Sequence, residues 1–380
     1  MRVVLSTYWV TEHLEAGGHF WVYAQYADAL RRLGCDVWWL EEMSSSKDGH
    51  AADAAARVLR ERLAHLGLGD RLILYRWASD GDGSRAHPSY LDVDADRAEQ
   101  VFRGTDLLLN FHYALPATML ARFTRTALVD IDPGLLQLWW TNEQLDVSRH
   151  DTYFSIGENL PDVPAHEGAR WVHTAPAVSL PLWPYAFDPA ASRFTTVTSW
   201  DSHTYVTMDG ALFDTNKRRS YLDHHDVPRR TGRQLEIATI FGASELAHRR
   251  LLETGGWSVR DPRVVAGTPQ AYRSYIQGSR GEFSCAKPAY VVLRNAWFSD
   301  RTACYLASGK PAVVQDTGPS RYLPSGLGLL RFSSPDEAVA AVADVDAHYE
   351  KHCRAAREIA ETYLSATDVV TRMLDCAVAG

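Results

Sequence analysis

The feature that most constrains the fold of this chain is an alternation of short apolar runs with amphipathic helical segments. Apolar runs at residues 2–9, 71–77 and 126–134 are separated by segments such as 20–34, whose apolar side chains recur at helical spacing. Short apolar runs are typical of strands buried on both faces of a parallel sheet. Strands that alternate with helices imply such a sheet, with helices covering both sides. The sequence therefore predicts an α/β fold with doubly wound sheets.

The alternation is interrupted once and then restarts. Residues 176–193 carry four prolines, a composition typical of a linker. Strands are expected again at 194–200, 234–241 and 290–294. We therefore predict two Rossmann-like domains that face a cleft. Their expected bounds are residues 1–185 for the N-terminal domain and 186–360 for the C-terminal domain, followed by a helix at 361–380 that packs back on the first domain.

Composition excludes several classes of protein. A net charge of -8 argues against a general nucleic-acid binder, which needs an excess of Lys and Arg. The five cysteines are scattered without a C-x-x-C pair, which favours reduced thiols over a disulfide framework or a metal site. The first apolar run is too short for a signal peptide, and no run reaches the length that spans a bilayer. We expect a cytoplasmic protein.

Ligands of open parallel sheets bind outside the carboxyl ends of the strands, so the loops after the strands hold the candidate site. In the first half, Gly18 and His19 open a helix after the first strand. His112 lies at the end of another strand, and Asp130 and Asp132 follow a third. Free amides at a helix start favour an anion or a polar substrate.

In the second half, the stretch WFSDRTACYLASGKPAVVQDTG at residues 297–318 predicts a loop, a helix, a buried strand and a polar tip. The positive end of the helix dipole and its free amides suit phosphate, and Arg301 can add a charge-assisted bond. Gln315 and Asp316 suit the hydroxyls of a sugar. The alternatives are a helix cap, a simple Asp-Thr-Gly turn and, for Lys217, a solvated basic patch.

With its Rossmann-like restart at mid-chain, the sequence FSDRTACYLASGKPAVV resembles nucleotide-sugar-dependent glycosyltransferases of the GT-B fold, similar to bacterial families 1 and 4. The likeness is strongest over residues 282–324. In that superfamily, a helix N-terminus beside an A-x-G-x-P-x-V turn holds the donor's diphosphate. Many retaining members carry a Glu-x7-Glu pair here, but Cys304 takes the place of the second Glu, so Asp300 or Glu282 is expected to contact the ribose.

The resemblance implies a donor site in the C-terminal domain and an acceptor site in the N-terminal domain. The donor is a nucleotide-diphosphate sugar used as co-substrate, without a further cofactor or metal. The acceptor is a secondary metabolite, another small molecule or a saccharide, and a homodimer is left open. The expected donor-binding residues are Gly18, Ser199, Lys217, Glu282, Ser299, Asp300, Arg301, Thr302, Gln315, Asp316 and Thr317, and the expected acceptor-binding residues are His112 and Trp139.

Inverting members of this superfamily use a histidine at the start of their first helix as a general base, oriented by a later aspartate. His19 matches the histidine, and Asp130 and Asp132 match the aspartate. The resemblance thus implies an inverting transfer with these three catalytic residues and with His112 as a reserve base. A retaining transferase, in which His19 caps the helix or contacts phosphate, and an epimerase or hydrolase that relies on the carboxylates remain as alternatives.

Overall fold

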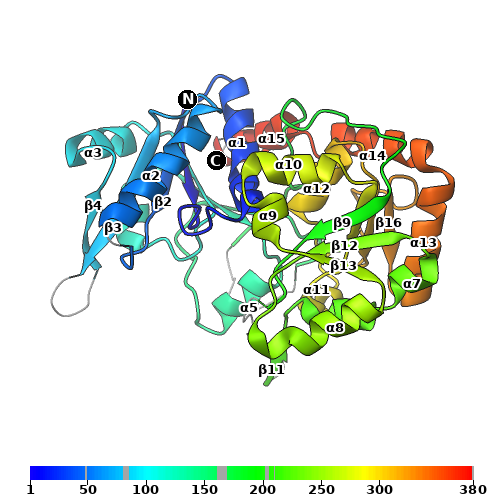
Figure 1. The fold of residues 1–380 in the computed structure, drawn as a ribbon. Helices are drawn as coiled ribbons and strands as arrows, with labels where there is room; N and C mark the ends of the chain where they lie inside the picture. The colour runs from blue at the N-terminus through cyan, green and yellow to red at the C-terminus, as the bar shows by residue number, and fades with distance from the viewer. Residues whose placement is uncertain (48, 80–84, 161–168, 202–204, 209, 379–380) are drawn as a thin grey trace.

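The computed structural model contains two mostly parallel β-sheets, each flanked by helices and built one after the other along the chain (Figure 1). It describes residues 1–47, 49–79, 85–160, 169–201, 205–208 and 210–378. The first sheet is built from the N-terminal half and the second from residues beyond 192. The predicted pair of doubly wound α/β units is confirmed.

Within the described residues, the first sheet has eight strands in the order β4-β3-β2-β1-β5-β6-β7-β8. All neighbours pair in parallel except β4, which runs antiparallel to β3 at the edge. The strands are β1 (Arg2–Thr7), β2 (Asp36–Glu42), β3 (Leu72–Ser79), β4 (Arg85–Tyr90), β5 (Leu107–Asn110), β6 (Thr126–Asp130), β7 (Thr152–Ser155) and β8 (Trp171–His173). The helices of this half are α1 (Gly17–Arg32), α2 (Gly49–Ala64), α3 (Ala95–Arg103), α4 (Ala117–Leu120) and α5 (Leu135–Thr141).

The uninterrupted apolar run of β1 is explained by burial on both faces of the sheet. Val3 and Leu5 belong to the core cluster that contains residues of α1 and α2, whereas Val4 belongs to a second cluster with Val101 and Phe102 of α3. Successive side chains of a strand point to opposite faces, so a strand covered on both sides needs apolar residues at every position.

The second sheet has the order β13-β12-β9-β14-β15-β16, and all of its neighbours pair in parallel. Its strands are β9 (Arg193–Val197), β12 (Gln234–Ala238), β13 (Trp257–Arg260), β14 (Gly281–Ser284), β15 (Ala312–Gln315) and β16 (Leu329–Phe332), and a separate hairpin joins β10 (Tyr205–Met208) to β11 (Ala211–Asp214). The helices are α6 (Arg218–Asp223), α7 (Val227–Thr231), α8 (Leu246–Thr254), α9 (Pro262–Ala266), α10 (Pro269–Gln277), α11 (Pro288–Leu293), α12 (Asp300–Ala307), α13 (Pro335–Ala347), α14 (Tyr349–Tyr363) and α15 (Ala366–Val378), with a 3-10 turn, η2, at Ala243–Glu245.

One predicted strand is wrong. Residues 290–294 were expected to be extended, but most of them lie in helix α11, which has Pro288 at its start. Proline suits the first turn of a helix because its missing N–H has no intrahelical partner there. The strand of this region is instead the four-residue β14, which lies between β9 and β15.

The two halves share one apolar core. Helix α1 packs against α10, α12 and α15, and the same buried cluster contains Tyr23 of α1, Ile276 of α10, Tyr305 of α12 and Val369 of α15. Figure 1 shows α1 beside α10 and α15 at the junction of the halves. The predicted domain bounds stay predictions, since the core is continuous across them. No helix in the described part of the chain combines the length and apolar character of a membrane span.

Candidate active site

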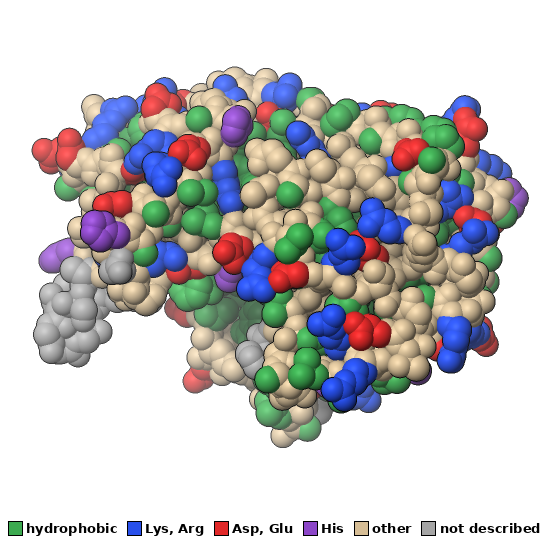
Figure 2. Space-filling model, viewed as in Figure 1, with side chains coloured by type: hydrophobic (Ala, Val, Ile, Leu, Met, Phe, Trp, Pro, Cys, Tyr) green, Lys and Arg blue, Asp and Glu red, His purple; other side chains and the backbone are tan. Residues whose placement is uncertain are grey.

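A cavity of about 760 Å³ lies between the two halves, at the carboxyl ends of β1, β5 and β6. Most of its lining comes from the first half, and Ser199 and Lys287 contribute from the second. The space-filling view shows the surface hollowed between the two halves, with hydrophobic side chains in the recess (Figure 2). Its size and its position at a junction of domains are typical of small-molecule sites.

Asp132 links the two halves at the wall of this cleft. Its Oδ1 lies 2.9 Å from Nζ of Lys287 and also accepts a hydrogen bond from the hydroxyl of Tyr290. Burial alone would raise the pKa of Asp132, but the positive charge of Lys287 and these hydrogen bonds together hold it below its usual range. The carboxylate is therefore ionised and already paired.

Asp130 has a different environment. It is fully buried and accepts hydrogen bonds from Ser155 Oγ at 2.7 Å, from Gln137 Nε2 at 3.0 Å and from the backbone N–H of Asp132 at 2.9 Å. Burial raises its pKa to about 6. These bonds fix the loop that carries Asp132, so Asp130 positions its neighbour instead of facing the cleft.

His19 does not pair with either aspartate, as the sequence had led us to expect. Its Nε2 lies 2.6 Å from the carbonyl oxygen of Tyr8. A carbonyl only accepts, so Nε2 carries the proton and Nδ1 is the unprotonated nitrogen. Burial lowers the pKa of His19 to about 4, which keeps the imidazole neutral at pH 7. The ring is positioned by a backbone carbonyl, because both carboxylates are engaged elsewhere.

The glycines before His19 have a packing role. A Cβ atom on Gly17 would lie 2.1 Å from the carbonyl oxygen of Thr268, and one on Gly18 would lie 2.6 Å from the ring of Tyr272. Thr268 caps α10 and Tyr272 lies within it. Glycine thus lets the first turn of α1 approach the second half closely. This packing accounts for Gly18 without the donor contact that the sequence suggested.

The first turn of α12 is held from within the protein. The side chain of Ser299 caps it by accepting the N–H of Arg301 at 3.3 Å. Arg301 Nε donates to Glu282 Oε1 at 2.8 Å, and its Nη1 donates to the carbonyl of Val197 at 3.0 Å. Arg301 and Glu282 are both buried. This geometry does not favour the expected contacts of Arg301 with phosphate and of Glu282 with ribose.

Lys217 is the cation best placed to receive a ligand. Among the described residues, its ammonium group forms no ion pair and lies 5.6 Å from the centroid of the Trp297 ring. Burial lowers its pKa to about 7, and the positive charges of Arg301 and Lys287 act in the same direction. Asp300 opposes this shift, and burial in turn raises the pKa of Asp300. The half-buried ammonium group of Lys217 is therefore without an ion-pair partner in the described part of the chain.

One of the strand-tip residues, Gln315, lines a small hollow beside α12. Gln315 Oε1 accepts the N–H of Ala286 at 3.0 Å, and Thr317 Oγ1 donates to the carbonyl of Trp297 at 2.7 Å. Asp316 is partly exposed at the end of β15. The residues that line the hollow include Ser299, Thr302 and Gln315. Internal bonds therefore hold Gln315 and Thr317, which are two of the three donor-binding residues expected at this strand tip.

Of the two expected acceptor-binding residues, Trp139 of α5 lines the cavity. His112 is buried, with its ring 5.1 Å from that of Tyr8, which lines the cavity. Sequence reasoning missed Lys287, because the strand before it, β14, was not recognised. The Lys-Pro pair after a short strand-like run, at 281–288, is the signal that would have identified it.

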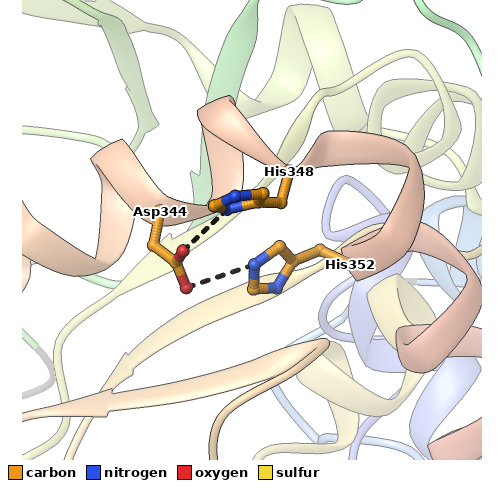
Figure 3. Close-up of side chains that lie close together, drawn as sticks. All are labelled: Asp344, His348 and His352. Carbon is orange, nitrogen blue, oxygen red and sulfur yellow. Dashed lines mark hydrogen bonds and ion pairs between the residues drawn. The ribbon is translucent and has the colours of Figure 1, made fainter.

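A second cluster lies on the outer side of the C-terminal half (Figure 3). Asp344 of α13 lies 2.9 Å from Nδ1 of His348 and 3.3 Å from Nε2 of His352. His352 Nδ1 accepts the backbone N–H of Gly328 at 3.1 Å, so the proton of the neutral ring is on Nε2. A metal-binding histidine offers a lone pair and donates from its other nitrogen. The arrangement therefore favours hydrogen bonding between α13 and α14 over metal ligation.

Comparison with known proteins identifies the architecture. No family model matches the sequence, and no curated protein matches it. Several solved structures are similar over nearly the whole chain. An alpha-glucosyltransferase in complex with UDP and a DNA 13-mer has a TM-score of 0.63 at 11% identity, covering 100% of both chains.

Two further solved structures are similar to this chain over nearly its whole length. The pneumococcal O-GlcNAc transferase GtfA, in complex with UDP and GlcNAc, has a TM-score of 0.58 at 9% identity, covering 99% of this chain and 98% of its own. Sucrose-phosphate synthase from Thermosynechococcus elongatus has a TM-score of 0.57 at 10% identity, with the same coverage. At these identities the likeness shows the fold. The chain has the GT-B fold of two Rossmann-like units around a cleft, as these glycosyltransferases do.

Proposed function

We propose that this protein is a glycosyltransferase that moves a sugar from a nucleotide-diphosphate donor to a hydroxyl group of an acceptor in the cleft. The observation that carries the proposal is Lys217, which forms no ion pair among the described residues and interacts electrostatically with Asp132 and Lys287, two residues that line the cavity between two Rossmann-like units. Similar structures of glycosyltransferases with bound UDP support it. A net charge of -8 does not favour DNA as the acceptor, although one of those structures holds DNA.

Lys217 and Lys287 are the proposed partners of the diphosphate. Lys287 is held by Asp132, whereas Lys217 has no counterion among the described residues. A diphosphate would supply the missing negative charge and restore the ordinary pKa of the Lys217 ammonium group. Because these two side chains offset the charge, we propose that transfer proceeds without a divalent metal ion. Activity that survives excess EDTA would support this point, and activity restored only by added Mg²⁺ would contradict it.

In the proposed reaction, the acceptor oxygen bonds to the anomeric carbon of the donor sugar. The bond from that carbon to the phosphate oxygen breaks, and its electron pair leaves with the nucleoside diphosphate. We propose that the acceptor proton passes to the departing phosphate oxygen and that the anomeric configuration is retained. The basis is His19, which has a pKa of about 4 and, within the described residues, no carboxylate partner, whereas an efficient general base titrates near the working pH. NMR of the product decides this point, since an inverted linkage would return His19 to the role of base.

Calorimetric titration with UDP, dTDP, GDP and ADP tests the function itself. At about pH 8, nucleotide binding should be accompanied by the uptake of about one proton at Lys217. The buffer releases that proton, so the measured heat of binding should change with the ionisation enthalpy of the buffer. Lys217→Met should abolish the proton uptake and weaken binding by about 1.5–3 kcal/mol. Lys351→Met, which changes an exposed lysine of α14, is the matched control. Failure of all four nucleotides to bind would overturn the proposal.

A further inference from the structure

One wall of the cleft is almost entirely aromatic or aliphatic. It consists of Tyr8, Tyr23, Phe111, Tyr113, Trp139 and Leu145, all from the N-terminal half. Tyr23 and Phe111 are buried beneath the surface of this wall, whereas Tyr8 keeps 37% of its surface exposed. An aromatic ring exposed inside a cavity offers a flat face to a ligand. We call this set of six residues the aromatic wall.

The backbone next to Tyr8 is held in an uncommon conformation. Trp9 has a φ of 51°, although it is not glycine, and its ring stacks on that of Tyr8 with centroids 4.9 Å apart. A bulky residue at positive φ is strained, and such strain concentrates at ligand-binding sites. The strained turn holds the Tyr8 ring in place at the edge of the cavity, which is an observation independent of the wall's composition.

Two hydroxyl groups of the aromatic wall and the neighbouring His19 already have protein partners. The Tyr113 hydroxyl accepts the N–H of Ile131 at 2.8 Å, and the Tyr23 hydroxyl and His19 Nε2 both approach the carbonyl of Tyr8, at 3.5 Å and 2.6 Å. A saccharide bound here would leave several of its hydroxyls without partners, which disfavours binding. An aromatic molecule needs a single hydrogen-bonding hydroxyl at the reacting centre.

Other residues at the cavity are polar. Lys287, Ser199 and Asp132 line it, and Lys217 lies close by. These groups suit the diphosphate and the hydroxyls of the donor sugar. The remaining space therefore faces the aromatic wall. A volume of about 760 Å³ accommodates a sugar together with a molecule of one or two rings.

We propose that the acceptor is an aromatic small molecule with a hydroxyl group, bound against Tyr8 and Trp139. The inference rests on the proposed function and deepens it by naming the class of acceptor. The acceptor's O–H bond is exchanged for a bond to the anomeric carbon, the carbon–phosphate oxygen bond breaks, and the proton leaves with the nucleoside diphosphate. The products are an aromatic glycoside and the nucleoside diphosphate.

The test uses the full chain and two probes, the hydroxycoumarin 4-methylumbelliferone and the disaccharide maltose. Each is titrated calorimetrically in the presence of saturating UDP. We expect 4-methylumbelliferone to bind at least about tenfold more tightly than maltose. Tyr8→Leu and Trp139→Leu should each weaken this binding by about tenfold or more. Tyr322→Leu, which changes an exposed tyrosine outside the cleft, serves as the control and should leave the affinity unchanged.

The outcomes separate this inference from the proposed function. If UDP binds but maltose binds better than the coumarin, or neither acceptor probe binds, the aromatic acceptor is wrong while the transferase proposal stands. If the coumarin binds and no nucleoside diphosphate does, the proposed function fails. Titration of each variant with UDP shows whether its cleft is folded, and an unchanged coumarin affinity in both folded Leu variants overturns the role of the aromatic wall.

Discussion

Helices α1 and α12 both begin near the cleft, but their first turns have different partners. Among the described residues, no side chain caps the first turn of α1, and its two glycines pack directly on the other half, at the N-cap of α10 and at Tyr272 within that helix. The first turn of α12 is capped by Ser299 and braced by the Arg301–Glu282 pair. The same signal, a helix start near the cleft, therefore accompanies an interface between domains in one case and a braced turn in the other. The free backbone amides at a helix start therefore do not by themselves show whether a ligand or the protein itself binds to them.

The largest expected effect comes from breaking the brace of α12. Arg301→Met leaves the buried Glu282 carboxylate without its counterion, since the two side chains are 7% and 0% exposed. Removing one partner of such a pair typically lowers the free energy of unfolding by about 3–5 kcal/mol. Urea denaturation measures this loss.

Two controls sharpen this first prediction. Arg301→Met combined with Glu282→Leu should recover part of the loss, because no unpaired charge remains. Arg354→Met breaks an exposed pair with Glu350 and should change the stability by less than about 1 kcal/mol. If Arg301→Met is as stable as wild type but binds UDP more weakly, Arg301 contacts the nucleotide and does not stabilise α12.

The next effect concerns the contact of α1. Gly17→Ala places a methyl group 2.1 Å from the backbone oxygen of Thr268, which cannot rotate away. We expect a loss of about 1–3 kcal/mol, the range for overpacking. Gly49→Ala is a matched control at the start of α2, where a new Cβ meets nothing within 4 Å and should stabilise by about 0.4–1 kcal/mol. Equal midpoints of thermal unfolding for the two variants would contradict the close contact at α1.

The comparison of α1 and α12 also shows what the sequence could predict. Apolar runs and helical spacing were sufficient for two doubly wound sheets, because strand burial is a local pattern. The four-residue strand β14 (Gly281–Ser284) was not predicted, because a strand this short is defined by its neighbours in the sheet. The ion pair of Asp132 and Lys287 was not predicted, because the two residues are 155 positions apart in the sequence.

The candidate site was predicted unevenly for a similar reason. Position at a strand end is readable from sequence, and it brought Asp132, Ser199 and His19 to the cleft. Which partner each side chain takes depends on tertiary distances, so spacing suggested a carboxylate for His19, whereas its partner in the structure is the carbonyl of Tyr8. Arg301 illustrates the same limit, because it forms an ion pair with Glu282, a buried residue of β14.

A smaller effect is expected from the cap of α12. Ser299→Ala removes the bond to the Arg301 N–H and should lower the free energy of unfolding by about 1 kcal/mol. Ser334→Ala removes the equivalent cap of α13, away from the cleft, and is the matched control. If the first turn of α12 also contacts the donor, only Ser299→Ala should weaken UDP binding. Equal UDP affinities in calorimetry would leave Ser299 as a cap alone.

The smallest effect at pH 7 is expected at His19, in the first turn of α1. Burial lowers its pKa from the ordinary value of 6.5 to about 4, and the positive end of the helix dipole also disfavours the imidazolium. Between these two values the unfolded chain binds more protons than the folded protein, so the stability from this group rises with pH. It is complete above about pH 6.5 and is lost as the pH falls toward about 4.

His19→Gln removes this titration, and its amide can still donate to the Tyr8 carbonyl. The variant should match wild type near neutral pH and lose less stability than wild type between about pH 6.5 and 4.5. Urea denaturation across that range measures the difference, with His50→Gln, a change at an exposed histidine of α2, as the control. If His19→Gln and wild type lose stability equally as the pH falls, folding does not lower the pKa of the His19 imidazole. The first turn of α1 would then be open to water, and its glycines would lose their role as a sealed contact between the halves.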